Sequence, residues 1–247
     1  MAAGALLSTV FIAARESLEA FLIMGILGGM AVKLGHPEAR RNLLLGGLLG
    51  LLVSVVAGVG VIAGAREAVS AGGEVVALGA SMLAVAILTY MVVWMYRHTI
   101  QLMGSLHGKT KAALEAGKPA ALASLAFIAV VREGVETAAF LATGGGNPTD
   151  LALGVLGGLA LSAAIAALVF SGLLRLSIER FFLFTGVLLV GFATYMIGHE
   201  LSGVVVGDLH VAQGDWVGWG VAALYALALL AFLFQSKWRK TKTAQTL

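Results

Sequence analysis

Seven long stretches of the chain are almost entirely apolar, and shorter, more polar segments separate them. They lie near residues 6–31, 43–64, 75–96, 121–143, 151–173, 180–202 and 216–235. Each has about the 20 apolar residues that a helix needs to cross a bilayer. Strands of a membrane barrel are shorter and alternate in polarity. The pattern therefore predicts an all-α polytopic membrane protein with seven transmembrane helices.

Composition supports this fold class. Of the 247 residues, 60% are hydrophobic and only 12% are charged, which is about half the charged fraction of a soluble domain. The absence of cysteine excludes disulfides, thiolate metal ligands and thiol redox chemistry. We expect one transmembrane domain over residues 1–247, in contact with the lipid bilayer and with no nucleic-acid partner.

The distribution of Lys and Arg predicts the orientation, because cytoplasmic loops carry the excess. Only Arg66 lies between predicted helices on one side of the membrane. The other side has thirteen basic residues: Lys33, Arg40, Arg41, Arg97, Lys109, Lys111, Lys118, Arg175, Arg180, Lys237, Arg239, Lys240 and Lys242. The N-terminus is therefore expected outside and the C-terminus in the cytoplasm.

The first six predicted helices divide into two similar groups of three. Residues 15–19 match 132–136 at an offset of 117, residues 43–54 match 151–162 at 108, and residues 89–91 match 194–196 at 105. Because three is odd, the second group crosses the membrane in the opposite direction, which makes a 3+3 inverted repeat. We expect a first repeat over 1–98, a cytoplasmic loop over 99–120 that could hold a short amphipathic helix, a second repeat over 121–203, and an outer loop, seventh helix and basic cytoplasmic tail over 204–247.

Two of the predicted helices each carry an arginine and two glutamates near the middle, in the same order and spacing. These are Arg15, Glu16 and Glu19 in the first helix and Arg132, Glu133 and Glu136 in the fourth. Charges at this depth are unfavourable unless they are compensated, and glutamates three residues apart share one helix face. If the two faces meet, the six groups have a net charge of −2 when all are ionised, which suits a small multivalent cation with oxygen ligands.

The arginines are expected to pair with the carboxylates and hold them at this depth. The alternative is purely structural, with two ion pairs that lock the two helices together. Such a lock needs one carboxylate per arginine, whereas each helix has two. The sequence leaves open whether the four glutamates form one site or two.

At these residues the chain resembles the iron permease family, the membrane subunits of high-affinity, oxidase-linked iron uptake. That family includes EfeU-type bacterial and fungal permeases, within the iron/lead transporter superfamily. Its hallmark is Arg-Glu-x-x-Glu, usually with Gly in third place, in helices 1 and 4 of seven. Residues 132–136 have this form, whereas Ser17 replaces the Gly in residues 15–19. Residues 89–95 and the pair His199 and Glu200 also resemble the family's third and sixth helices.

The resemblance implies a transporter of the inner (plasma) membrane and not an enzyme. It implies that iron, as Fe³⁺ or Fe²⁺, is the transported substrate and that no cofactor is permanently bound. The family's iron-binding positions correspond to Glu16, Glu19, Glu133 and Glu136. An extracytoplasmic protein that oxidises or delivers iron is the implied partner. Independently of the resemblance, the seventh helix stands outside the repeat, so it could serve in packing or in contacts of an oligomer.

Acidic and histidine residues also gather near the predicted outer surface. His199 and Glu200 lie at the end of the sixth helix, and the segment that follows adds Asp208, His210 and Asp215 without any Lys or Arg. These residues could bind cations at the outer surface and so form an entry or secondary metal site. The alternative is ordinary polar residues at a helix end and in a loop.

Two other interpretations fit less well. A divalent-metal or lead transporter of the same superfamily would use the same carboxylates. An intramembrane enzyme is remote, because the sequence has no Gly-x-Ser-x-Gly element, no His-Glu-x-x-His pair and no Asp pair of protease type.

Overall fold

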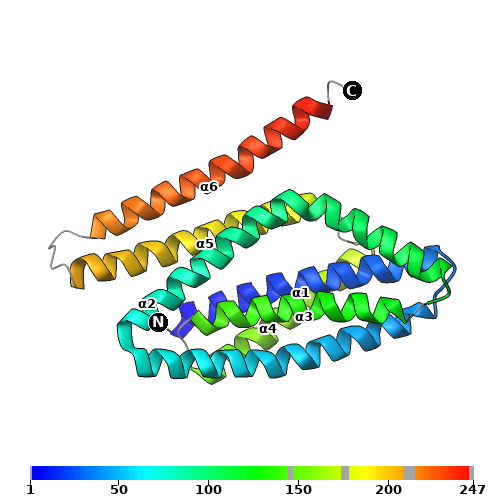
Figure 1. Ribbon diagram of the computed structural model, residues 1–247, viewed down its shortest axis with the longest axis horizontal. Coiled ribbons are helices and arrows are strands. Elements are labelled where there is room, and N and C mark those ends of the chain that lie inside the picture. Colours follow the sequence, from blue (N-terminus) through cyan, green and yellow to red (C-terminus); the bar gives the residue numbers. More distant parts are fainter. Residues whose placement is uncertain (1, 119, 144–146, 174–177, 208–214, 245–247) are drawn as a thin grey trace. The chain divides into compact units, whose positions relative to one another are not determined.

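The computed structural model describes residues 2–118, 120–143, 147–173, 178–207 and 215–244. All the regular elements in these residues are helices (Figure 1). In chain order they are α1 (Ala2–Lys33), α2 (Ala39–Glu115), α3 (Ala121–Thr143), α4 (Pro148–Phe170), α5 (Ile178–Gly207) and α6 (Asp215–Ala244). The prediction of an all-α protein is confirmed.

Several of these helices are long and apolar enough to cross a membrane. Four such stretches are Ala39–Gly73, Val75–Trp94, Pro148–Phe170 and Trp216–Leu233, and Leu183–His199 is a shorter apolar stretch in α5. Helices α1 and α3 also have the length, but each has three charged residues in its middle. A polytopic membrane protein is therefore confirmed, while the count of seven helices and the orientation stay predictions.

Helix α2 contains two of the apolar stretches that the sequence predicts as separate helices. They meet at Gly73, whose backbone angles are φ 63° and ψ −151°. Only glycine adopts this conformation readily, so the sequence can bend here without a loop. The same element continues to Glu115, so residues 99–115, expected as a loop that could hold a short helix, are helical throughout.

The residues form two compact units, and each unit takes segments from both halves of the sequence. Unit 1 comprises Met1–Gly72 and Ile100–Leu176, and unit 2 comprises Gly73–Thr99 and Ser177–Leu247. In unit 1, α1 packs against both α3 and α4 (Figure 1). In unit 2, α5 packs along α6, and the Thr89 hydroxyl lies 2.7 Å from the Tyr225 hydroxyl of α6.

Glycines bring α2 into close contact with α3 in unit 1. A Cβ atom added at Gly46 would overlap the backbone of Ala123, and one added at Gly50 would lie 2.9 Å from the carbonyl oxygen of Phe127. Side chains at these positions would force the helices apart. The small residues therefore determine how closely α2 approaches the helix that carries the second motif.

The contact between α4 and α1 uses the corresponding residues. A Cβ atom at Gly154 would lie 3.4 Å from the Leu6 carbonyl oxygen, and one at Gly158 would lie 2.7 Å from that of Val10. These glycines follow those of α2 by 108 residues, and their partners on α1 precede those on α3 by 117. Both offsets are the ones found in the sequence. The two halves of the sequence thus make matching contacts, each with a helix of the other half.

Large apolar side chains cover much of the outer surface of unit 1. On α2, Leu48, Leu52 and Val56 are exposed, as is Leu156 on α4. In a soluble protein such a surface would promote aggregation. In a bilayer it is the surface that contacts lipid.

Candidate metal site

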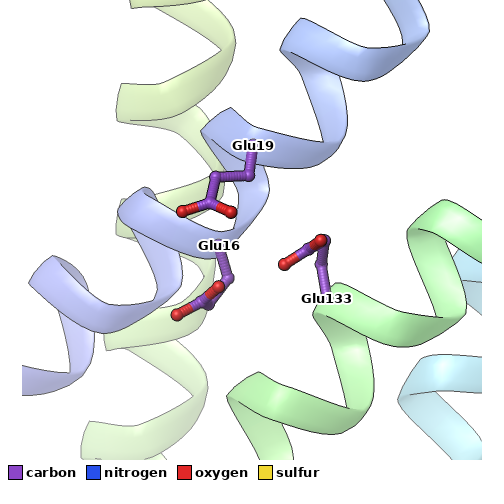
Figure 2. A group of neighbouring side chains, drawn as sticks. All are labelled: Glu16, Glu19 and Glu133. Carbon is purple, nitrogen blue, oxygen red and sulfur yellow. The ribbon is translucent and has the colours of Figure 1, made fainter. Parts of the chain in front are cut away.

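Glu16, Glu19 and Glu133 meet inside unit 1 (Figure 2). Each has a carboxylate oxygen, and these three atoms lie within 4.8 Å of one another. The first two come from adjacent turns of α1, and Glu133 points toward them from α3. All three residues are buried. Carboxylate oxygens that converge in this way can bind a hard metal ion.

Apolar neighbours keep the charged turn of α1 in the interior. Ile12 and Ala13 lie before the motif, Leu18 lies within it and Leu22 lies after it, and all four are buried. α1 runs from Ala2 to Lys33 and continues through the charged turn without a break. The glutamates are therefore carried on a regular helix, which positions them more accurately than a loop would.

Arg15 interacts with both glutamates of its own motif. Its Nη1 atom donates a hydrogen bond to Glu16 Oε1, and its Nη2 atom lies 2.7 Å from Glu19 Oε1. The arginine side chain is only 1% exposed. One positive charge thus lies between two negative charges in the interior of unit 1.

Arg132 is placed differently in the second motif. Its Nε atom donates to Glu136 Oε1 at 2.8 Å and lies 4.0 Å from Glu133 Oε1. The Arg132 side chain is 31% exposed. Arg132 therefore interacts mainly with Glu136, and Glu133 is the member of the three-carboxylate group with the weaker arginine contact.

Four glutamates each have a buried carboxylate oxygen that accepts no hydrogen bond from the described residues. These atoms are Oε2 of Glu16, Glu133 and Glu136 and Oε1 of Glu19, the last of which is in an ion pair with Arg15. A buried acceptor without a donor is unfavourable by about 1–3 kcal/mol, and more when it is charged. A cation between the carboxylates would satisfy several of these oxygens at once. Glu136 is not one of the three glutamates whose oxygens lie within 4.8 Å of one another, but it also has a buried oxygen that accepts no hydrogen bond.

Among the outer candidates from the sequence, only His199 has a described side chain, and it is not one of the three clustered ligands. His199 belongs to unit 2, is exposed on α5, and its ring centroid lies 5.9 Å from that of Tyr195. The side chains of Glu200 and Asp215, and the whole of Asp208 and His210, lie outside the described residues. An outer metal site at these positions stays a prediction.

One residue that contacts the second motif was not singled out from the sequence. Ser54 of α2 lies against Gly134, the third residue of the second motif, and its Oγ atom lies 3.3 Å from the Val130 carbonyl oxygen. The only sequence signal was that Ser54 matches Ser162 at the 108-residue offset. That match does not say which helix either serine contacts.

Several proteins are similar to this chain. An uncharacterised protein of Archaeoglobus fulgidus is 29% identical over 195 residues, which cover 78% of this chain and 68% of that protein. The iron permease EfeU of Bacillus subtilis is 27% identical over 78% of this chain and 42% of its own length. The ferrous iron permease EfeU of Yersinia pestis is 25% identical over 71% of this chain and 64% of its own length. The chain thus spans less than two thirds of these two named permeases.

No solved structure matches the chain significantly. A comparison with protein-family models covers more of the sequence than the individual relatives do. Residues 6–206, which include both motifs, match the model of the iron permease FTR1 family. Together with the apolar helices, this match agrees with a multi-pass protein of the inner (plasma) membrane. The resemblance predicted from the two Arg-Glu-x-x-Glu segments is confirmed, and the chain belongs to the iron permease FTR1 family.

Proposed function

We propose that this protein is an iron permease that moves iron into the cytoplasm through the carboxylates of α1 and α3. The observation that carries the proposal is the convergence of Glu16, Glu19 and Glu133 within 4.8 Å in an apolar helical unit. The family and the printed names of the relatives support iron as the substrate. Iron in either oxidation state accepts carboxylate oxygens.

The charge of the site supports cation binding over a structural lock. Arg15 contacts two carboxylates and Arg132 contacts mainly one, so the negative groups exceed the positive groups. Excess buried charge is unfavourable without a counter-ion. A structural ion pair would need no third carboxylate beside Arg15. Glu133 is therefore the ligand whose charge an arriving cation would balance most directly.

A closed apolar region lies along α1 on the C-terminal side of the glutamates. Ile23, Leu27 and Ala31 follow Glu19 at four-residue intervals and therefore continue its helix face. They form one buried cluster with Leu43, Leu106 and Leu114 of α2 and Leu122 of α3. In the orientation we propose, this is the cytoplasmic side. An ion leaving the site along this face must wait until the cluster opens.

The proposed transport path runs between two inverted three-helix repeats. Support comes from the matching glycine contacts of α2 with α3 and of α4 with α1, which share the sequence offsets of 108 and 117. Transporters of this plan bind their substrate near the midplane, where the repeats meet. We place the N-terminus outside and the C-terminus in the cytoplasm, and we expect an extracytoplasmic protein to oxidise or deliver the iron.

Removing one carboxylate charge tests this function. We expect Glu133→Gln to lower radiolabelled iron uptake into proteoliposomes by at least about tenfold, because even groups that only orient metal ligands typically contribute that much. Gln keeps the size of the side chain, so the protein should still insert and purify normally. Ferrous iron, ferric citrate and lead should be offered separately and in competition.

The matched control is Glu38→Gln. Glu38 lies at the start of α2, its side chain is 64% exposed, and it is far in sequence from both motifs. Its uptake should equal that of the unmodified protein. Normal uptake by Glu16→Gln and Glu133→Gln alike would reject the carboxylate site. Transport of lead in preference to both forms of iron would reject iron as the substrate.

A further inference from the structure

We propose that Ser54 of α2 is a positioning residue for the metal site, which fixes the turn of α3 that carries Glu133. The inference rests on the proposed function. It adds to that site a residue outside both Arg-Glu-x-x-Glu motifs. Two independent contacts of Ser54, one steric and one polar, carry the argument.

The steric contact is with Gly134. A Cβ atom added at Gly134 would overlap the Cβ and Oγ atoms of Ser54. Ser54 thus occupies the space that a side chain at the third motif position would need. The second motif must have glycine there as long as α2 has serine opposite. The distance between α2 and α3 is set at this point by the Ser54 side chain.

The polar contact lies one turn earlier on α3. Ser54 Oγ lies 2.7 Å from the Gly50 carbonyl oxygen in its own helix and 3.3 Å from the Val130 carbonyl oxygen in α3. A hydroxyl has one proton to donate, so these two acceptors share it. Val130 is three residues before Glu133. The hydroxyl therefore links α2 to the turn that presents the glutamate.

The two contacts act on Glu133 through the helix backbone. Adjacent helical residues point about 100° apart, so Gly134 faces α2 while Glu133 faces α1. Movement of α3 away from Ser54 would therefore displace the Glu133 carboxylate relative to Glu16 and Glu19. Because the three ligand oxygens lie within 4.8 Å, even a small shift changes their ability to share one ion.

The first motif lacks this arrangement. Its third residue is Ser17, and the serine that corresponds to Ser54 is Ser162. The Ser162 hydroxyl donates to the Leu159 carbonyl oxygen at 2.9 Å, within its own helix α4. The requirement for glycine thus belongs to the second motif, where Ser54 provides a reason for it.

The test combines a substitution that should weaken iron binding with a second substitution that should restore it. Gly134→Ala should raise the KM for radiolabelled ferrous iron in proteoliposomes by about tenfold, as loss of a ligand-orienting group does. Ser54→Gly combined with Gly134→Ala should return the KM to within about threefold of the original, because the space is vacated. Ser54→Ala, which removes only the hydroxyl, should raise the KM by a smaller factor with little change in maximal rate.

Gly58→Ala is the matched control, since an added Cβ there would meet the Ala138 Cβ at 3.4 Å, an ordinary contact in the same helix pair. It should leave the KM unchanged. The proposal is overturned if the double variant is as impaired as Gly134→Ala at equal membrane yield, or if Gly134→Ala transports normally. Glu133→Gln, assayed in parallel, separates the two hypotheses. Normal iron uptake by Glu133→Gln rejects the metal site itself. Loss of uptake by Glu133→Gln together with normal uptake by Gly134→Ala rejects only the role of Ser54.

Discussion

The two arginines of the site have the same place in their motifs but different surroundings. Arg15 is almost fully buried and contacts Glu16 and Glu19, whereas Arg132 is partly exposed and interacts mainly with Glu136. Removing one partner of a buried ion pair leaves an uncompensated charge in the interior, which is far more destabilising than the loss of an exposed pair. The equivalent motif positions therefore differ in their importance for stability.

This difference predicts unequal effects of the same substitution. We expect Arg15→Gln to lower the free energy of unfolding by about 3–5 kcal/mol, the range for breaking a buried pair. Arg132→Gln should have a clearly smaller effect on stability. Thermal unfolding of both purified variants in detergent measures the difference. Equal shifts in the unfolding temperature would show that the exposure of the two arginines does not govern stability.

At the scale of helices, the packing depends on backbone contacts at glycine. In α2, Gly46 lies against the backbone of Ala123, which cannot move aside as a flexible side chain can. Gly60, in the same helix, has no atom of another element within 4 Å of an added Cβ. The two glycines have the same chemistry but only one is at a helix–helix contact.

We therefore expect Gly46→Ala to lower stability and Gly60→Ala not to lower it. Alanine favours a helix over glycine by about 1 kcal/mol, so Gly60→Ala should be neutral or stabilising. At Gly46, overpacking should outweigh that gain and lower stability by about 1–3 kcal/mol. Unfolding temperatures and the yield of detergent-extracted protein would measure both. An increase in stability for Gly46→Ala would contradict the proposed close contact.

At the scale of the whole molecule, the two compact units do not coincide with the two halves of the sequence. Unit 1 contains both motif helices, α4 and residues 39–72 and 100–115 of α2, whereas unit 2 contains α5, α6 and residues 73–99 of α2. Each half thus depends on the other for its contacts within a unit. A single half, expressed alone, would lack the partners of its glycine contacts.

The orientation can be tested by labelling because the chain has no cysteine of its own. Lys111→Cys and Ser70→Cys place single thiols at exposed positions. In intact cells an impermeant maleimide should label position 70 and should reach position 111 only after the membrane is broken. The opposite pattern would reverse the topology. Thr110 is unsuitable for this purpose, because it is completely buried although its neighbours in sequence are basic and exposed.

The helices themselves could largely be predicted from the sequence, and their ends less well. Long apolar runs leave few alternatives to a helix in a membrane, so the predicted range 121–143 coincides with α3. The region from Arg97 to Lys118 was expected as a loop that could hold a short amphipathic helix. In the structure α2 extends through it to Glu115, and Leu106 and Leu114 are buried in an apolar cluster with residues of α1 and α3.

The amino-acid sequence by itself determined the class of protein, the two charged motifs and the offsets that relate the two halves, because these depend on local hydropathy and residue spacing. Only the tertiary structure decided that Glu16, Glu19 and Glu133 come together, that Arg15 is buried while Arg132 is partly exposed, and that Ser54 lies against Gly134. Spacing along one helix fixes which face a residue occupies. Which face of another helix lies opposite depends on how closely the two backbones can pack, and glycine contacts between distant parts of the chain decide that distance.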